Sequence, residues 1–166
     1  MRPRIALLFI SLLLSSLGIG APYNPHIGTW KIYLVPNSRG LETKYSPDSP
    51  VPVPRSQTFQ FEPSGADGMK FTADTVEADG RATHVEYTAQ FDGKDYPVKG
   101  DPNRDTVALT RDKPYIVEGV SKKAGEVTGN FRMVVWGNGL IMEFTSKETR
   151  NGKTYENFSV FNKVLK

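Results

Sequence analysis

Apolar and polar residues alternate along most of this chain, and the alternation defines its elements. Near the N-terminus every second side chain of one run is apolar, namely Trp30, Ile32 and Leu34. A period of two predicts a strand with one buried face. The same rhythm recurs downstream and predicts strands at residues 29–35, 57–61, 69–76, 81–91, 96–98, 106–110, 115–121, 131–136, 140–145 and 154–164. No stretch shows a convincing helical period.

Short turn sequences separate these runs. Asp79-Gly80 and Asn151-Gly152 are strong hairpin signals, because both residues tolerate the positive φ that tight hairpin turns require. Links that are nearly all hairpins favour an up-and-down meander. An open meander would leave two exposed edges, whereas closure pairs the first strand with the last and places Trp30 opposite residues 160–164. The sequence therefore predicts an all-β, up-and-down antiparallel barrel of about 8 to 10 strands.

Residues 36–54 interrupt the rhythm. Prolines occupy positions 36, 47, 50, 52 and 54 of this segment, and each lacks the N–H that a strand ladder needs. We expect this proline-rich loop to form no strand of the main sheet and to lie over one barrel end as a lid, with Tyr45 as an anchor.

The beginning of the chain differs from the rest. A basic start is followed by an almost wholly apolar run at residues 5–17, which ends in small residues up to Gly20. This pattern is typical of a cleaved secretory signal peptide, whereas a membrane anchor usually needs about 20 apolar residues. We expect residues 1–20 to be removed and residues 21–166 to form one secreted or periplasmic domain. We expect no stable membrane insertion after cleavage.

Charge and cysteine content exclude several classes of function. Removing the first twenty residues takes away two arginines and no acid, which lowers the net charge from +3 to +1. Lys122-Lys123 is the only adjacent basic pair in the remaining sequence. Because nucleic-acid surfaces need clustered basic charge, we expect no nucleic-acid partner. The chain has no cysteine, which excludes disulfides, thiolate metal sites and a thiol nucleophile.

Catalytic and metal-binding chemistry finds little support in the sequence. The two histidines, His26 and His84, fall on different elements, and neither has a second ligand at a helpful spacing. His84 and Glu86 share one strand face, where a surface pair is commoner than an acid–base pair. Asp92 and Asp95 are too few for calcium, which takes about six to eight oxygen ligands. We therefore expect no metal, no cofactor and no catalytic residue.

Large apolar side chains on the inward faces are the remaining signal. A barrel of about eight strands is just wide enough to be filled by its own side chains or to hold one small ligand. Both outcomes stay open from the sequence. The residues that we expect to line the lumen, and to contact any ligand there, are Phe59, Phe61, Phe71, Tyr87, Met133, Met142 and Phe144.

Gly28-Thr29-Trp30 resembles the glycine-x-tryptophan signature of lipocalins and their calycin relatives. The chain is similar to secreted bacterial lipocalin-like proteins of uncharacterised function, most clearly at residues 28–31, 91–98 and 105–109. The resemblance implies a small barrel with a lumen for a small apolar ligand and with Gly28 and Trp30 as a structural signature. The family's threonine-aspartate-tyrosine motif, its C-terminal helix and the last-strand arginine that covers the tryptophan are not evident.

Three functions are compatible with these observations. The first is a secreted binding protein that holds a small hydrophobic molecule in the barrel lumen. The second is a ligand-free, filled barrel that acts as a structural or protein-interaction module. The third, which the sequence favours least, is an enzyme that uses His84. An enclosed apolar cavity would favour the first, a packed lumen the second, and a polar cleft at His84 the third.

Processing of the chain can be tested directly. When the full sequence is expressed in a secreting bacterial host, we expect the exported protein to begin at Ala21, because the small residues before it suit signal peptidase. N-terminal sequencing and intact mass measure this. Exported protein that still begins with Met1 would contradict the prediction.

Overall fold

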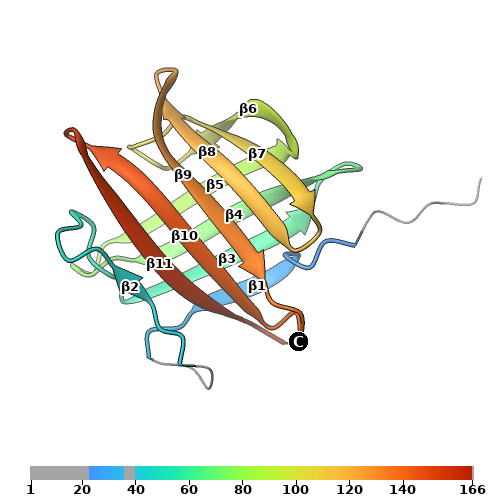
Figure 1. The fold of residues 1–166 in the computed structure, drawn as a ribbon, viewed down its shortest axis with the longest axis horizontal. Coiled ribbons are helices and arrows are strands. Elements are labelled where there is room, and N and C mark those ends of the chain that lie inside the picture. The colour runs from blue at the N-terminus through green and yellow to red at the C-terminus, as the bar shows by residue number, and fades with distance from the viewer. Residues whose placement is uncertain (1–22, 36–39, 166) are drawn as a thin grey trace, which may run out of the picture.

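The computed structural model describes residues 23–35 and 40–165, which form a closed β-barrel (Figure 1). No helix occurs within these residues. The expected signal peptide, residues 1–20, and positions 36–39 of the proline-rich loop lie outside the described residues. The strands are β1 (Gly28–Ile32), β2 (Lys44–Tyr45), β3 (Ser56–Pro63), β4 (Gly68–Val76), β5 (Ala82–Gln90), β6 (Asp92–Lys99), β7 (Thr106–Lys113), β8 (Ile116–Lys123), β9 (Glu126–Val135), β10 (Ile141–Arg150) and β11 (Lys153–Lys163).

Each strand from β3 to β11 pairs antiparallel with the next, and β1 pairs with both β3 and β11. Ten strands therefore close the ring, and β2 is an additional strand. The predicted all-β, up-and-down antiparallel barrel is confirmed. Trp30 lies opposite Lys163, and Ile32 opposite Phe161, so the predicted pairing of the first and last strands is also confirmed.

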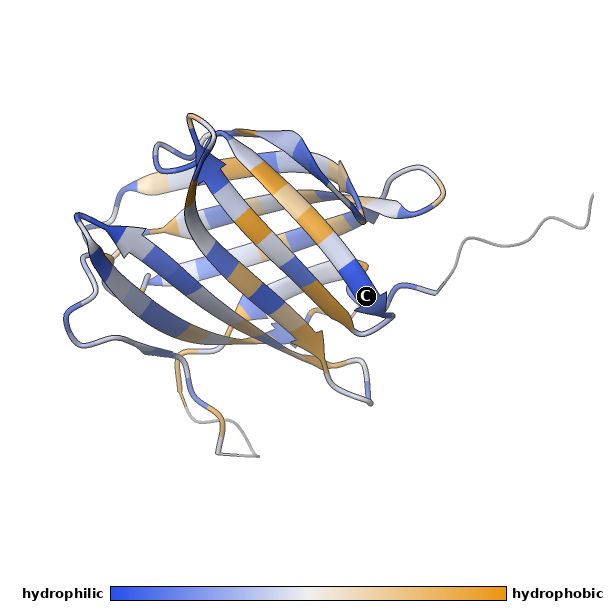
Figure 2. Ribbon diagram, turned by 45° about the horizontal axis from the view of Figure 1, so that its top comes forward, coloured by the Kyte–Doolittle hydropathy of each residue, from blue (hydrophilic) through white to orange (hydrophobic). Residues whose placement is uncertain are grey.

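The barrel has two ends, which we name by their residues. The Trp30 end contains Gly28, the β7–β8 turn and the β9–β10 turn, and the chain's C-terminus lies beside it (Figure 1). The far end contains β2 and the β8–β9 and β10–β11 turns. Hydrophobic and hydrophilic residues alternate along the strands that connect the two ends (Figure 2), as a wall with one buried face requires.

Inward-facing side chains fill the barrel from the Trp30 end to its middle. Trp30 and Leu109 are fully buried in one apolar cluster. Gly119 also faces inward, where a Cβ atom would lie 2.1 Å from the Phe131 ring. Glycine at this position therefore makes the space that the aromatic ring occupies.

Strand β1 is shorter than the alternation predicts. It ends at Ile32, and Leu34 is 43% exposed, so the expectation that Leu34 shares the inward face of Trp30 is wrong. The N–H of Tyr33 still donates to the Val160 carbonyl at 2.7 Å. After Tyr33 the chain no longer pairs with β11 along this stretch, so the side chains of Leu34 and Val35 are exposed.

The proline-rich loop contributes a strand, contrary to the prediction. Within residues 36–54, β2 pairs with Asn157 and Phe158 of β11. β1 pairs with the same edge of β11, and β2 pairs with it at positions nearer the far end. Ser46 extends the contact through its backbone N–H and hydroxyl, which both donate to the Glu156 carbonyl. This part of the loop continues the barrel wall, and β1 and β2 act as one interrupted strand.

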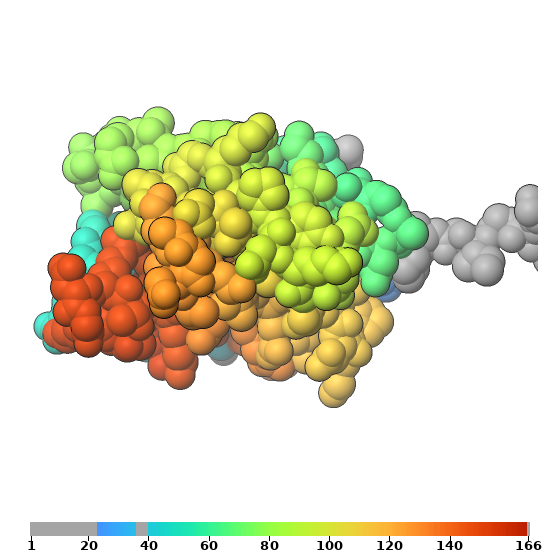
Figure 3. All heavy atoms as spheres, turned by 90° about the horizontal axis from the view of Figure 1, so that it is seen from above, coloured from blue at the N-terminus to red at the C-terminus, as the bar shows by residue number. Residues whose placement is uncertain are grey.

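The pairing between β5 and β6 is short. It consists of Glu86 with Lys99 and Tyr87 with Val98. The N–H of Val98 donates toward β7, so the neighbouring Pro97 nitrogen faces β5, where it has no hydrogen to donate. The ladder stops at this proline. On its other side β6 pairs with β7, and the atoms of these two strands, yellow-green to yellow, adjoin in the space-filling view (Figure 3).

Trp30 ties the segment before β1 to the barrel. Its indole N–H donates to the His26 carbonyl at 2.7 Å. The Lys163 ammonium lies 5.0 Å from the Trp30 ring centroid and donates to the Pro25 carbonyl at 3.1 Å. Lys163 thus covers Trp30 from the last strand, where the family resemblance leads one to look for an arginine. Gly28 has a φ of 129°, and a Cβ there would lie 2.9 Å from the Lys163 side chain.

The contribution of Trp30 to stability is measurable. We expect Trp30→Ala to lower the free energy of unfolding by about 3–5 kcal/mol, the usual cost of emptying a buried aromatic site. Trp30→Phe keeps most of the buried ring and should cost less. Urea unfolding measures both, with Trp136→Phe as the control at an exposed tryptophan. A loss below about 1 kcal/mol for Trp30→Ala would contradict the structure.

Candidate ligand-binding site

The residues expected to line the lumen come together in one cluster, in which all are buried except the partly buried Phe144. Phe59 stacks on Phe161 with ring centroids 4.3 Å apart, and it packs edge-on against Phe71 at 5.0 Å and Phe144 at 5.6 Å. These side chains therefore fill this part of the lumen by contact with one another. That they also bind a ligand stays a prediction for Phe59, Phe61, Phe71, Tyr87, Met133, Met142 and Phe144.

Inward-facing side chains become polar toward the far end. The Tyr45 and Ser159 hydroxyl oxygens are 3.4 Å apart, and burial raises the pKa of Tyr45. The Arg104 guanidinium donates to the Ser121 hydroxyl at 3.3 Å and also pairs with the Asp101 carboxylate at 2.9 Å. Hydrogen-bonded side chains thus occupy the far end of the barrel.

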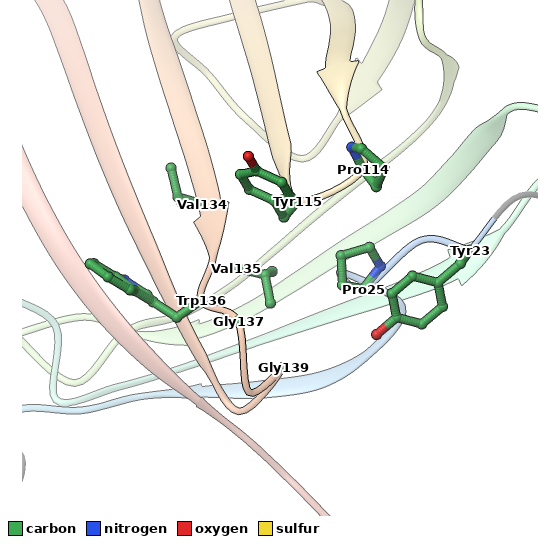
Figure 4. Close-up of a pocket in the computed structure, with 9 residues that line it drawn as sticks. All are labelled: Tyr23, Pro25, Pro114, Tyr115, Val134, Val135, Trp136, Gly137 and Gly139. Carbon is green, nitrogen blue, oxygen red and sulfur yellow. The ribbon is translucent and has the colours of Figure 1, made fainter.

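An open apolar pocket lies at the Trp30 end (Figure 4). Its volume is about 390 Å³, which falls in the range of roughly 300–1,000 Å³ that is typical of small-molecule sites. None of its lining side chains carries a charge. The lining residues are Tyr23, Pro25, Pro114, Tyr115, Val134, Val135, Trp136, Gly137 and Gly139.

Three separate segments build this pocket: the lead-in to β1, the β7–β8 turn and the start of the β9–β10 turn. The Val135 N–H donates to the Tyr115 carbonyl at 2.9 Å, which fixes the two turns against each other. The Gly139 N–H donates to the Trp136 carbonyl at 2.7 Å and closes the second turn. Figure 4 shows Pro25 across the pocket from Val135.

His26 lies next to the pocket in the lead-in segment and is fully buried. Its Nδ1 is 3.1 Å from the Asn24 side-chain oxygen, while its Nε2 has no hydrogen-bond partner among the described residues. Burial lowers the pKa of His26 to about 4. The positive charges of Arg111 and Lys163 act in the same direction, and the Met133 backbone opposes them. His26 is therefore an uncharged structural residue at neutral pH.

His84 is placed on the outer wall, away from the pocket. Its Nδ1 lies 2.6 Å from an Asp74 carboxylate oxygen, and both side chains are more than half exposed. Glu86 pairs instead with Lys99 at 3.2 Å, so His84 and Glu86 have different partners. Among the described residues, no three or more histidine, aspartate or glutamate side chains could together hold a metal ion.

Tyr115 and Trp136 line the pocket, although the sequence pattern does not predict them as ligand-binding residues. Alternation marks inward residues, whereas these two aromatic side chains flank turns, next to Pro114 and Gly137. The sequence feature that could have indicated these positions is an aromatic residue next to a turn-forming proline or glycine. Its partner segments became adjacent only through the closure of the barrel.

No family model matches the chain, and no curated protein is recognisably similar to it. Among solved structures, the chain is similar to the siderocalin Ex-FABP, which functions through dual ligand specificities. The TM-score is 0.36 at 11% identity, over 85% of this chain and 75% of that chain. This overlap is too loose to carry an argument about function. No helix among the described residues has the length and apolar character to cross a membrane.

The buried His26 makes stability depend on pH. Its pKa is about 4 in the folded protein against 6.5 for an ordinary histidine, so the unfolded chain binds the proton more tightly. Stability is then retained above pH 6.5 and is lost as pH falls toward 4, by about 3 kcal/mol. The measurement is urea unfolding of wild type and His26→Gln from pH 7 to pH 4. Equal pH dependence of the two proteins would contradict the assignment.

Proposed function

We propose that this protein is a secreted or periplasmic binding protein for a small hydrophobic molecule, and that the pocket at the Trp30 end receives this molecule. One observation carries the proposal: a pocket of about 390 Å³ whose lining contains no charged side chain. An apolar surface of this kind gains free energy when a ligand removes it from water, at roughly 25 cal/mol per Å². The basic start and apolar run of the first twenty residues support export.

The pocket connects to the predicted lumen through one side chain. Val135 lines the pocket and also belongs to the buried core, and its strand partner is Met142. Methionine is unbranched and adapts to irregular space. A ligand in the pocket can therefore extend toward the lumen by displacing methionine side chains, which links it to the residues identified by alternation.

A filled barrel without a ligand is the second candidate function, as a structural or protein-interaction module. The observation that favours it is the ring packing inside the lumen, where Phe71 and Tyr87 stack with centroids 4.7 Å apart. Because these rings already pack against one another, they leave no free aromatic surface for a ligand to contact. Saturable binding of an apolar molecule separates the two candidates.

The proposal is tested by titrating residues 21–166 with a neutral, apolar fluorophore. We expect saturable binding that Tyr115→Ser weakens by about 1–2 kcal/mol, or roughly five- to thirty-fold in Kd, because one apolar wall is lost. Val127→Ser is the matched control, since Val127 is an exposed apolar residue near the far end. Both variants should retain the wild-type melting temperature.

Other results assign the protein differently. Absence of saturable binding would contradict the proposal and favour the filled barrel. If Tyr115→Ser leaves Kd unchanged and Phe144→Leu raises it, the ligand binds in the lumen, as the sequence predicts. Equal weakening by Tyr115→Ser and Val127→Ser would indicate non-specific adsorption.

A further inference from the structure

Exposed large apolar side chains gather at the Trp30 end of the barrel. They come from the lead-in segment, from the two turns and from the end of the chain. The Lys163 N–H donates to the Leu140 carbonyl at 2.9 Å, so the last residues lie beside the β9–β10 turn. We call this set the apolar end: Tyr23, Tyr115, Trp136, Leu140, Val164 and Leu165.

The rest of the described surface shows no comparable gathering. The other exposed large apolar residues are Leu34, Val35 and Val53, which belong to the segments between β1 and β3, and Val127 near the start of β9. The far end instead presents hydrogen-bonded side chains such as Arg104. The apolar side chains thus occupy the part of the Trp30 end formed by the lead-in segment, the β7–β8 and β9–β10 turns and the last residues. Exposed Asp67, Asp92 and Lys94 lie elsewhere on the same end, in the β3–β4 turn and at the start of β6.

The chemistry of the apolar end matches a lipid surface. Tyrosine and tryptophan combine an apolar ring with a polar group, and both are enriched at membrane–water interfaces. Charges around this end are balanced. Exposed Asp112 and Lys113 have opposite signs, Arg111 pairs with Asp67, and Lys94 pairs with Asp92 at 2.9 Å. The Lys163 ammonium is turned onto the Pro25 carbonyl and the Trp30 ring. A neutral, zwitterionic bilayer therefore suits this face.

The position of the preceding sequence points to the same surface. The apolar run at residues 5–17 ends six residues before Tyr23, which lies on the pocket. Six residues span at most about 20 Å. Until residues 1–20 are removed, a membrane that holds this run would therefore lie within about 20 Å of Tyr23 at the apolar end.

We infer that the apolar end docks peripherally on a zwitterionic lipid bilayer, with Trp136, Tyr115 and Leu165 entering the interface. The pocket then opens toward the acyl chains, and the bilayer is the source of its hydrophobic ligand. This last step rests on the proposed function, whereas docking itself requires only the apolar end. The contact is interfacial and inserts no strand into the bilayer.

Vesicles of pure phosphatidylcholine test the docking. The ring of strands is complete within residues 23–165, so residues 21–166 contain the whole barrel. The chain has two tryptophans, of which Trp30 is buried and Trp136 is 41% exposed, so a change in emission reports Trp136. We expect a blue shift on vesicle addition, and quenching when the lipid acyl chains are brominated. Both signals should be absent in Trp136→Phe.

Flotation of the vesicles measures the strength of docking. The double variant Tyr115→Ser/Leu165→Ser should partition about tenfold more weakly, whereas Val127→Ser should equal wild type. High salt should leave partitioning unchanged, because the attraction is apolar.

Other outcomes overturn the inference. No flotation, or flotation lost in high salt, would show that the apolar end does not dock in this way. A blue shift that follows protein concentration without lipid would assign the face to self-association. The fluorophore titration without vesicles tests the proposed function independently of docking. Ligand binding without flotation would contradict the docking inference and leave the proposed function standing. Flotation without ligand binding would contradict the proposed function, and with it the step in which the bilayer supplies the ligand.

Discussion

Hydrogen bonding between the first and last strands is the constraint on which the rest of this structure depends. The register that sets Trp30 opposite Lys163 brings the ammonium over the indole ring and within reach of the Pro25 carbonyl. The lead-in segment is thereby pinned across the Trp30 end. Without closure, β1 and β11 would both be open edges, and the pocket would lose the wall that the lead-in supplies.

Alternation in the sequence identified nearly every strand, because a strand with one buried face repeats its apolar residues with a period of two. It failed where tertiary partners decide the outcome. Leu34 continues the pattern but lies beyond the last β1 contact with β11. Lys44–Tyr45 lies among prolines, yet it pairs with β11 because closure leaves part of that edge open beyond β1. The contact between Lys163 and Trp30 likewise could not be predicted from the sequence, because it depends on the register between β1 and β11.

The candidate site was less predictable than the fold, for a related reason. The pattern marks side chains that point inward, and it correctly gathers Phe59 and its neighbours into one core. The pocket is built instead from turn residues such as Tyr115 and Trp136, which follow no period. Their adjacency to Tyr23 is set by the path of the chain around the whole ring. Only the three-dimensional structure brings these segments together.

The hydrogen bonds at the far end and the open pocket at the Trp30 end bear on where the proposed ligand would enter. Entry at the far end requires breaking the contacts of Tyr45 with Ser159 and of Arg104 with Ser121. Each hydrogen bond contributes about 0.5–1.5 kcal/mol, and buried groups left unpaired cost more. At the opposite end the pocket already exists, and Val135 alone both lines it and belongs to the apolar core. The pocket thus offers the proposed ligand an apolar surface that is open without breaking the hydrogen bonds of the far end, and we expect entry at the Trp30 end.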